Sequence, residues 1–259
     1  TVEKLVAQFD IDNDRMLLEQ GIASCQGGIS LESVELRAPI PQPRQDILVM
    51  ENNFSANEAE HADFVARKLE DKSLLPTYFY KKATLANRDK GVIQSFPGRV
   101  ESLDYQAELC VVLGKDAWQV PEDEAEKYIM GYVVINNVIA RNLVLKHRRP
   151  YIATSLDSYL PMSPYITTAD EFTDNFVFRI QSFVNGQLRQ DATTELQMFT
   201  PQYAISDLSR YGVLKAGTIL TTGTPFGSGK DMTPPCYLKI GDVVSCLVEG
   251  VGSVTNTIE

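Results

Sequence analysis

Apolar residues recur at helical spacing in two segments of the chain. Residues 57–71 (NEAEHADFVARKLED) place apolar side chains three to five positions apart, which predicts an amphipathic helix. Residues 200–211 predict a second helix, because Thr200 is a typical N-cap and a proline follows it at the first helical position. Residues 123–130 begin with acidic side chains, which favour the N-terminus of a third helix.

Short apolar runs separated by turn residues predict strands along the rest of the chain. The Asn185-Gly186 pair between two such runs is the strongest short hairpin signal, and Gly241-Asp242 is expected to separate the last two strands. The expected strands cover 34–40, 46–50, 104–113, 132–139, 177–183, 188–190 and 218–220, with two more inside 237–254. Many short strands with few helices indicate a β-rich α+β fold. We expect an N-terminal appendage over 1–45 and a single larger domain over 46–259.

Composition excludes several classes of function. The 259 residues contain 24 Lys and Arg against 34 Asp and Glu, a net charge of −10, which disfavours nucleic acid and anionic membranes as partners. No apolar run approaches the roughly 20 residues of a membrane span, and we see no secretory signal. Four cysteines without CxxC spacing indicate reduced thiols, so we expect a cytoplasmic protein. Two histidines exclude a His-rich metal site.

A series of short motifs carries a family resemblance. In order they are Pro76-x-x-x-x-Lys81, Asp104-Tyr105-x-x-Glu108-Leu109, Gly131-Tyr132, Asn136-x-x-x-Ala140-Arg141, Ser155-x-Asp157, Val184-Asn185-Gly186, Thr222-Gly223-Thr224-Pro225, Gly241-Asp242-Val243 and Gly250-Val251-Gly252. Each alone is weak, but their joint order and spacing, from about residue 34 to the end, resemble the fumarylacetoacetate hydrolase (FAH) family. The Gly-rich loop over 221–229 lacks Gly-Lys-Ser/Thr and is not a nucleotide-binding P-loop.

The resemblance implies a fold, an assembly and a class of chemistry. It implies an FAH-like mixed β-roll that assembles as a homodimer. It also implies a magnesium or calcium ion, held by a Glu-x-Glu pair and an Asp, which stabilises an enolate. Family members act on 2-oxo acids, 1,3-diketones and their enols as hydrolases, isomerases, tautomerases or lyases. The expected partner is therefore a small anionic metabolite.

The metal positions depart from the family pattern. They read Gln106, Glu108 and Asn137, so two of the three carboxylates have become amides. Gln106 and Glu108 still point to one face of a strand, but the charge falls from −3 to −1. Magnesium is usually bound through carboxylates, whereas calcium accepts amide oxygens more readily. We expect no strong metal site, and at most weak Mg²⁺ or Ca²⁺ binding by these three residues.

The proton-transfer positions depart as well. Thr154 stands where the family has a lysine that polarises the oxo acid. The family's His-x-x-Glu dyad reads Asn57 and Glu60, and an amide is no general base at neutral pH. His61 is the neighbouring candidate, although a solvated histidine on the helix is the simpler interpretation.

Several polar residues of the family pattern are retained. By resemblance, substrate binding is assigned to Lys81, Glu108, Arg141, Asp157, Gly223 and Thr224, and catalysis to Glu60, His61, Lys81, Arg141 and Thr224. An alternative for Arg141 is a buried ion pair with Glu108 that replaces the metal. The run Lys146-His147-Arg148-Arg149 is either a solvated basic face or a further anion-binding element.

These observations predict an FAH-family protein that acts on an enolisable 2-oxo acid or β-dicarbonyl compound. Tautomerisation, decarboxylation, elimination or cyclisation needs less from a metal than C–C hydrolysis does, and is favoured on that ground. The alternative is a non-catalytic family member that binds a metabolite or a protein partner. The combined changes at Asn57, Gln106, Asn137 and Thr154 favour this alternative.

Overall fold

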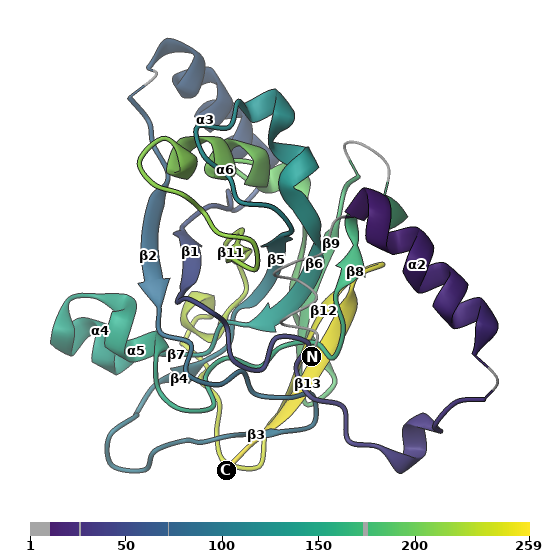
Figure 1. Cartoon of the computed structure of the whole chain (residues 1–259). Coiled ribbons are helices and arrows are strands. Elements are labelled where there is room, and N and C mark those ends of the chain that lie inside the picture. Colours follow the sequence, from purple (N-terminus) through teal and green to yellow (C-terminus); the bar gives the residue numbers. More distant parts are fainter. Residues whose placement is uncertain (1–10, 26, 72, 173–175) are drawn as a thin grey trace.

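The computed structural model describes residues 11–25, 27–71, 73–172 and 176–259. Two sheets form the body of the molecule (Figure 1). The six-stranded sheet has the order β2 (Thr77–Lys81), β1 (Ile47–Glu51), β11 (Ile219–Thr221), β5 (Ala107–Leu113), β6 (Ile129–Asn136) and β8 (Thr167–Thr168). The five-stranded sheet has the order β10 (Gln187–Thr193), β9 (Arg179–Val184), β12 (Val243–Val248), β13 (Gly252–Ile258) and β3 (Val92–Ile93). A two-stranded ladder pairs β4 (Leu103–Asp104) with β7 (Ile139–Ala140).

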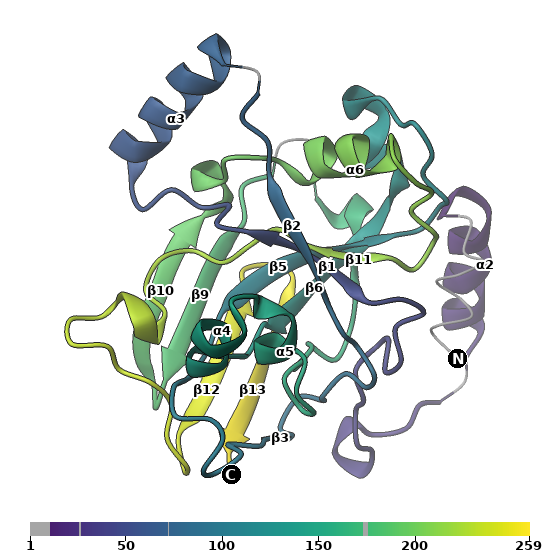
Figure 2. The same ribbon diagram turned by 90° about the vertical axis from the view of Figure 1, so that its left-hand side faces the viewer.

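Helices are few and lie outside the sheets (Figures 1 and 2). They are α2 (Ile11–Ser24), α3 (Glu58–Glu70), α4 (Arg141–His147), α5 (Pro150–Thr154) and α6 (Pro201–Ser209). Short 3₁₀ turns cover Leu31–Ser33, Glu122–Tyr128, Ala169–Glu171, Thr194–Leu196 and Gly229–Asp231. This mixed, sheet-rich α+β architecture is the one predicted from the sequence.

Strands β5 and β6 form the centre of the core. Every residue of both strands is buried, because the five-stranded sheet covers one of their faces and the segments that carry Ile40, Leu160 and Met162 pack on the other. Leu109 and Val111 belong to the cluster that includes Ile180 and Val248, whereas Cys110 belongs to the cluster around Ile47 and Val49. Burial on both faces explains why these strands are continuously apolar rather than alternating.

Most predicted elements are confirmed. Asn57 caps α3, with its Oδ1 accepting from the Glu60 N–H at 3.0 Å, and Thr200 caps α6 in the same way. The β9–β10 hairpin turns at Asn185 and Gly186, which both have positive φ as a type I′ turn requires. The expected strand over 104–113 is interrupted at 105–106, which separates β4 from β5.

Some predictions about elements are wrong. Residues 34–40 form no strand, and the expected helix over 123–130 is a 3₁₀ turn followed by the start of β6. The last hairpin turns at 249–251 and not at Gly241-Asp242, which instead precedes β12. Helices α4 and α5 were not predicted, because they are short and have no apolar periodicity. Of the expected appendage over 1–45, residues 1–10 lie outside the described part of the chain.

Candidate functional site

A cavity of about 280 Å³ opens beside the ends of β1, β5 and β7. Its size lies near the lower end of the roughly 300–1,000 Å³ typical of small-molecule sites. Its ionisable lining residues are Glu51, Glu60, Glu108, Arg141, Lys230 and Asp231, and its polar ones are Asn52, Gln106, Asn137 and Thr224. The remaining lining is apolar, from Val49, Met50, Phe54, Phe79, Ile139, Pro150, Met198, Pro225 and Phe226.

Three buried polar side chains form a chain at the cavity floor. Lys81 Nζ donates to Asn137 Oδ1 at 2.9 Å, and Asn137 Nδ2 donates to Glu108 Oε1 at 2.9 Å. Antiparallel pairing of β5 with β6 brings Asn137 beside Glu108, and Lys81 arrives from the end of β2. Lys81 is fully buried and Glu108 is 1% exposed. One ammonium and one carboxylate are therefore held on either side of a single amide.

Burial governs the protonation of this pair. It raises the pKa of Glu108 to about 7, although hydrogen bonding and the charges of Lys81 and Arg141 act in the opposite direction. It lowers the pKa of Lys81 to about 7, against the attraction of Glu108. Oε2 of Glu108 and Oγ1 of Thr221 are buried without a well-formed hydrogen bond among the described residues. The cavity is thus lined by a carboxyl group whose pKa lies near neutral pH, with Asn137 bonded to Oε1 and the Thr221 hydroxyl close to the group.

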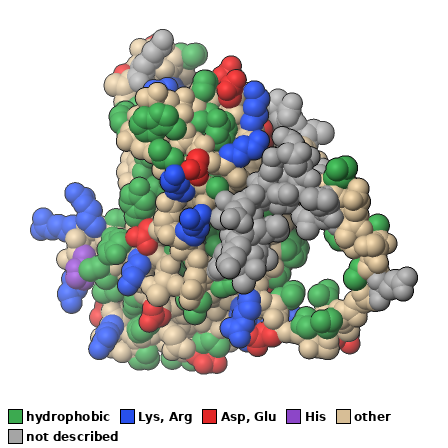
Figure 3. All heavy atoms as spheres, in the orientation of Figure 1, with side chains coloured by type: hydrophobic (Ala, Val, Ile, Leu, Met, Phe, Trp, Pro, Cys, Tyr) green, Lys and Arg blue, Asp and Glu red, His purple; other side chains and the backbone are tan. Residues whose placement is uncertain are grey.

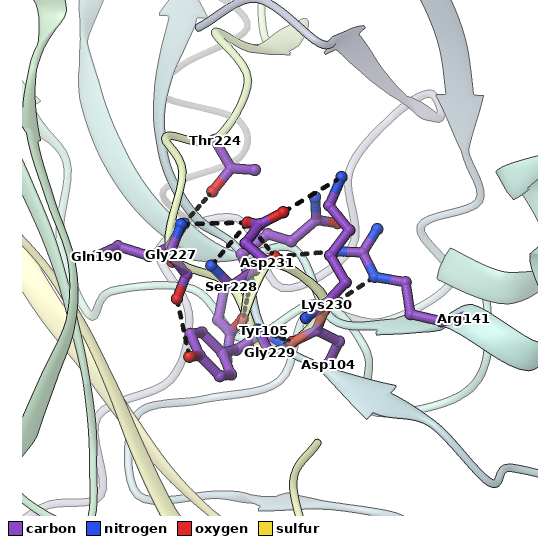
Figure 4. Close-up of polar contacts among 12 residues, drawn as sticks. Asp104, Tyr105, Arg141, Gln190, Thr224, Gly227, Ser228, Gly229, Lys230 and Asp231 are labelled. Carbon is purple, nitrogen blue, oxygen red and sulfur yellow. Dashed lines mark hydrogen bonds and ion pairs between the residues drawn. The ribbon is translucent and has the colours of Figure 1, made fainter. Parts of the chain in front are cut away.

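Arg141 is held by Asp104 (Figure 4). Arg141 Nε lies 2.9 Å from Asp104 Oδ2, and its Nη2 donates to Ser228 Oγ at 3.4 Å. Asp104 also accepts the backbone N–H groups of Gly229, at 2.7 Å, and Lys230, at 3.2 Å. Pairing of β4 with β7 places Asp104 beside the start of α4, so the alternative ion pair of Arg141 with Glu108 is wrong.

The loop that carries Thr224 is fixed by internal hydrogen bonds (Figure 4). The Thr224 hydroxyl donates to the Ala107 carbonyl at 2.9 Å and accepts from Gln190 Nε2 at 2.8 Å. Asp231 Oδ2 accepts from the N–H groups of Gly227 and Ser228 and from the Ser228 hydroxyl. Thr224 therefore lines the cavity with a side chain that internal hydrogen bonds hold in place.

Comparison with known proteins identifies the family. The family described as "Fumarylacetoacetate (FAA) hydrolase C-terminal" matches residues 47–259. This chain belongs to the fumarylacetoacetate hydrolase family. It is 31% identical over 229 residues to the oxaloacetate tautomerase YisK of Bacillus subtilis, covering 88% of this chain and 74% of that protein.

Two solved structures of the same family are similar throughout. The fumarylacetoacetate hydrolase EaFAH from Exiguobacterium antarcticum has a TM-score of 0.80 at 28% identity, with 94% of this chain and 87% of that chain covered. The 5-carboxymethyl-2-hydroxymuconate delta-isomerase from Mycobacterium smegmatis has a TM-score of 0.75 at 27% identity, with 90% and 85% covered. The FAH fold predicted from the motifs is therefore confirmed.

The donors at the family's metal positions do not fit a divalent ion. Asn137 Oδ1, the oxygen that would bind the metal, already accepts from an ammonium group, and the charges of Lys81 and Glu108 sum to zero. A hard cation needs negatively charged oxygen ligands, and Glu108 is the single carboxylate of the three positions. Within the described residues, no group of three or more His, Cys, Asp or Glu side chains could hold a metal ion. Two of the three positions are thus neutral amides, and one of them, Asn137, is already bonded to Lys81 and Glu108.

The helix that carries the family dyad is arranged differently from the expectation. Asn57 is occupied as the N-cap of α3, and Glu60 lines the cavity with its Oε2 accepting from the Ala56 N–H at 2.9 Å. His61 faces away from the cavity, into a separate groove beside Phe64, Lys68 and Tyr203. Of the two proton-transfer candidates on α3, the structure brings Glu60 to the cavity and leaves His61 outside it.

Other predicted residues also lie outside the cavity. Asp157 lines a different depression, together with Lys146 and Arg99. Gly223 shapes the loop behind the site, where φ is +84° and a Cβ atom would come within 3.1 Å of the Met50 carbonyl oxygen. The Thr154 hydroxyl turns back to the Pro150 carbonyl at 3.0 Å. Lys81 contributes through Asn137 and is not among the residues that line the cavity.

The basic run over 146–149 forms an exposed protrusion. All four of its residues are exposed at the end of α4, where Arg148 has a left-handed backbone (φ 56°). Figure 3 shows basic side chains gathered around a histidine on this part of the surface. None of the four lines the cavity.

Sequence reasoning missed the supporting polar residues. Asp104, Gln190, Ser228 and Asp231 hold Arg141 and the Thr224 loop in place. Asp104 belongs to the Asp-Tyr-x-x-Glu motif, so the motif itself was the signal, but its role depends on the β4–β7 pairing.

None of the helices in the described part of the chain has the length and apolar character of a membrane span.

Proposed function

We propose that this chain is an enzyme that moves a proton on a small enolisable 2-oxo acid and interconverts its keto and enol forms. One observation carries the proposal. The Glu108 carboxyl group lines the cavity, and among the described residues its Oε2 makes no well-formed hydrogen bond, although the Thr221 hydroxyl is close enough to lower the pKa of the group. An ionised oxygen in that position is a general base whose pKa, raised to about 7, suits proton transfer near neutral pH.

Lys81 and Asn137 set the charge environment and the orientation of the Glu108 carboxyl group. Asn137 Nδ2 orients the carboxyl group through Oε1, and Oε2, which Asn137 does not bond, is the oxygen proposed to take up the proton. Protonated Lys81 places a positive charge one amide away, which stabilises the carboxylate and any negative charge that develops nearby. The pair is preorganised because both side chains are buried and both are bonded to Asn137.

The remaining cavity residues bind and orient the acid. Arg141 Nη1 makes no hydrogen bond within the described residues. Arg141 and Lys230 both line the cavity, and we assign to them the binding of the substrate carboxylate. The Gln106 side chain lines the same cavity and can donate to the oxo oxygen. Thr224 holds the wall against which the substrate packs.

In the proposed reaction, Glu108 transfers one proton from carbon to oxygen of the substrate. Glu108 Oε2 takes a proton from C3, the C3–H electron pair forms the C2–C3 double bond, and the oxo oxygen becomes an enolate. The protonated Glu108 then delivers the same proton to the enolate oxygen, which gives the enol and regenerates the carboxylate. No water, oxidant or leaving group is consumed, so the reaction does not require the water-activating base that Asn57 has replaced.

The relatives support this class of reaction. One is named an oxaloacetate tautomerase and another a delta-isomerase, and both names describe movement of a proton and a double bond. C–C hydrolysis is less favoured, because Asn57, at the family's water-activating position, is an amide and caps α3. A homodimer in the cytoplasm remains a prediction from the family and from the cysteine content.

The test is deuterium exchange at C3 of 2-oxo acids in D₂O, followed by NMR with chelator-treated protein. Exchange is expected to be fast with the native chain and to fall at least about 100-fold in Glu108→Gln, the usual size of a general-base contribution. Glu101→Gln, which changes an exposed carboxylate outside this cavity, is the matched control. Equal exchange by native protein and Glu108→Gln would refute the proposal.

A non-catalytic binding protein is the second candidate. It is favoured by the fact that Thr224 and Asn57 use their side chains for internal hydrogen bonds, and Arg141 uses two of its nitrogens in the same way. For such a protein, calorimetry would detect a 2-oxo acid bound by native protein and Glu108→Gln alike, with no C3 exchange above the buffer rate.

A further inference from the structure

We infer that the cavity selects 2-oxo acids with one carboxylate and an uncharged apolar substituent over 2-oxo dicarboxylates. This inference rests on the proposed function, because it names the substrate class of the same site. It is carried by the uneven placement of charge around the cavity.

Positive charge is confined to one part of the lining. Arg141 and Lys230 are the cationic lining residues, and both are tied to the turn over 228–231. The Arg141 side chain bonds Ser228, and the Lys230 backbone bonds the same Asp104 carboxylate that pairs with Arg141. Asp104 already neutralises Arg141, and Lys230 Nζ lies 3.8 Å from Asp231 Oδ1. The hydrogen-bond donors that Arg141 and Lys230 leave free therefore suit a single substrate carboxylate.

The part of the lining that comes from β1 and α3 is apolar and acidic. Phe54 and Met198 lie on segments that hydrogen-bond each other, with Met198 N–H donating to the Asn53 carbonyl at 2.8 Å. Glu60 and Glu51 are the ionisable residues of this part. Glu60 is fixed there by the Ala56 N–H. The aromatic and thioether groups favour an apolar substituent, and the two carboxylates repel an anion.

Among the residues that the structure describes, no further cation lines the cavity to offset this repulsion. The basic protrusion over 146–149 is exposed to solvent and does not line the cavity. Lys81 is buried behind Asn137 and faces Glu108. A second substrate carboxylate would therefore lie near Glu60 and Glu51 without a counter-ion. The relative named oxaloacetate tautomerase carries a dicarboxylate in its name, so the inference separates this chain from it.

Phenylpyruvate and oxaloacetate test the inference as a matched pair. Both present a CH₂ group next to a 2-oxo carboxylate, and they differ in whether a phenyl ring or a second carboxylate follows. Affinity is measured by calorimetry, and kcat/KM by C3 deuterium exchange. Native protein is expected to favour phenylpyruvate by at least about tenfold, the effect of one like charge at a partly solvated site.

Variants on α3 locate the source of the preference. Glu60→Gln keeps an oxygen that can accept from the Ala56 N–H but removes the charge, so the phenylpyruvate-to-oxaloacetate ratio is expected to fall about tenfold. Glu58→Gln removes an exposed charge from the same helical turn outside the cavity, and is expected to leave the ratio unchanged. Equal or tighter binding of oxaloacetate by native protein, or equal ratio changes in both variants, would overturn the inference.

The two proposals fail in different ways. Calorimetric affinities test the substrate preference without turnover, whereas Glu108→Gln tests the proton transfer. A tenfold affinity preference without C3 exchange would support the selective site and refute the proposed reaction. C3 exchange of both acids with equal kcat/KM would support the reaction and overturn the selectivity.

Discussion

The interaction of Lys81 with Glu108 makes a quantitative prediction about stability. Lys81→Met keeps the length of the buried side chain but removes the ammonium group. The change leaves Asn137 Oδ1 without its donor, which costs about 1–3 kcal/mol of unfolding free energy for a buried polar group. It also leaves Glu108 as a buried carboxyl group without its nearby cation, which costs a further 3–5 kcal/mol, approximately, if the group stays ionised.

The second cost depends on pH. Glu108 already has its pKa raised to about 7, and loss of Lys81 raises the pKa further. A folded carboxyl with a raised pKa binds its proton more tightly than the unfolded chain does, so stability falls as pH rises through the folded pKa. Near pH 6 Glu108 is protonated and the variant loses only the hydrogen-bond contribution. Above pH 7 the deficit relative to native protein grows by about 1.4 kcal/mol per pH unit.

Urea unfolding at about pH 6 and about pH 8.5 measures this deficit, and the two values should differ by roughly 2 kcal/mol. The matched control is Lys82→Met, which removes a neighbouring exposed ammonium and should cost under about 0.5 kcal/mol at either pH. A Lys81→Met deficit that is the same at both pH values would refute the argument that Lys81 compensates the charge of Glu108.

Three further predictions concern the site. Gln106→Glu combined with Asn137→Asp changes the summed charge of Lys81, Glu108 and the two substituted residues from 0 to −2. Calorimetry should then detect binding of Mg²⁺ or Ca²⁺ that native protein lacks. Absence of binding heat would contradict the site assignment. Because Glu108 must be ionised to act as a base, C3 exchange should increase as pH rises through about 7, and a flat profile would exclude Glu108 from that role. Arg141→Ala should weaken 2-oxo acid binding by at least about tenfold, and unchanged affinity would remove Arg141 from carboxylate binding.

The family, the sheet-rich fold and the helices α3 and α6 could be predicted from the sequence. These features depend on local chemistry: Asn57 and Thr200 cap the helices that follow them, and Asn185-Gly186 supplies the positive φ values of a hairpin turn. The sequence also showed that two metal ligands had become amides, because the motif fixes their positions. Where local patterns were ambiguous, the predictions were wrong: residues 34–40 form no strand, and the turn between the last two strands lies at 249–251, since an apolar run does not specify its pairing partner.

Only the tertiary structure decided which polar groups meet. The pairing of β4 with β7 places Arg141 beside Asp104, and the pairing of β5 with β6 places Asn137 beside Glu108. Lys81 reaches that amide from β2, although it lies 56 residues away along the chain. Spacing along the sequence cannot fix such contacts, because strand register and order place each side chain. The neutral Lys81–Asn137–Glu108 chain, and the exclusion of His61 from the cavity, therefore follow from the fold and not from the motifs.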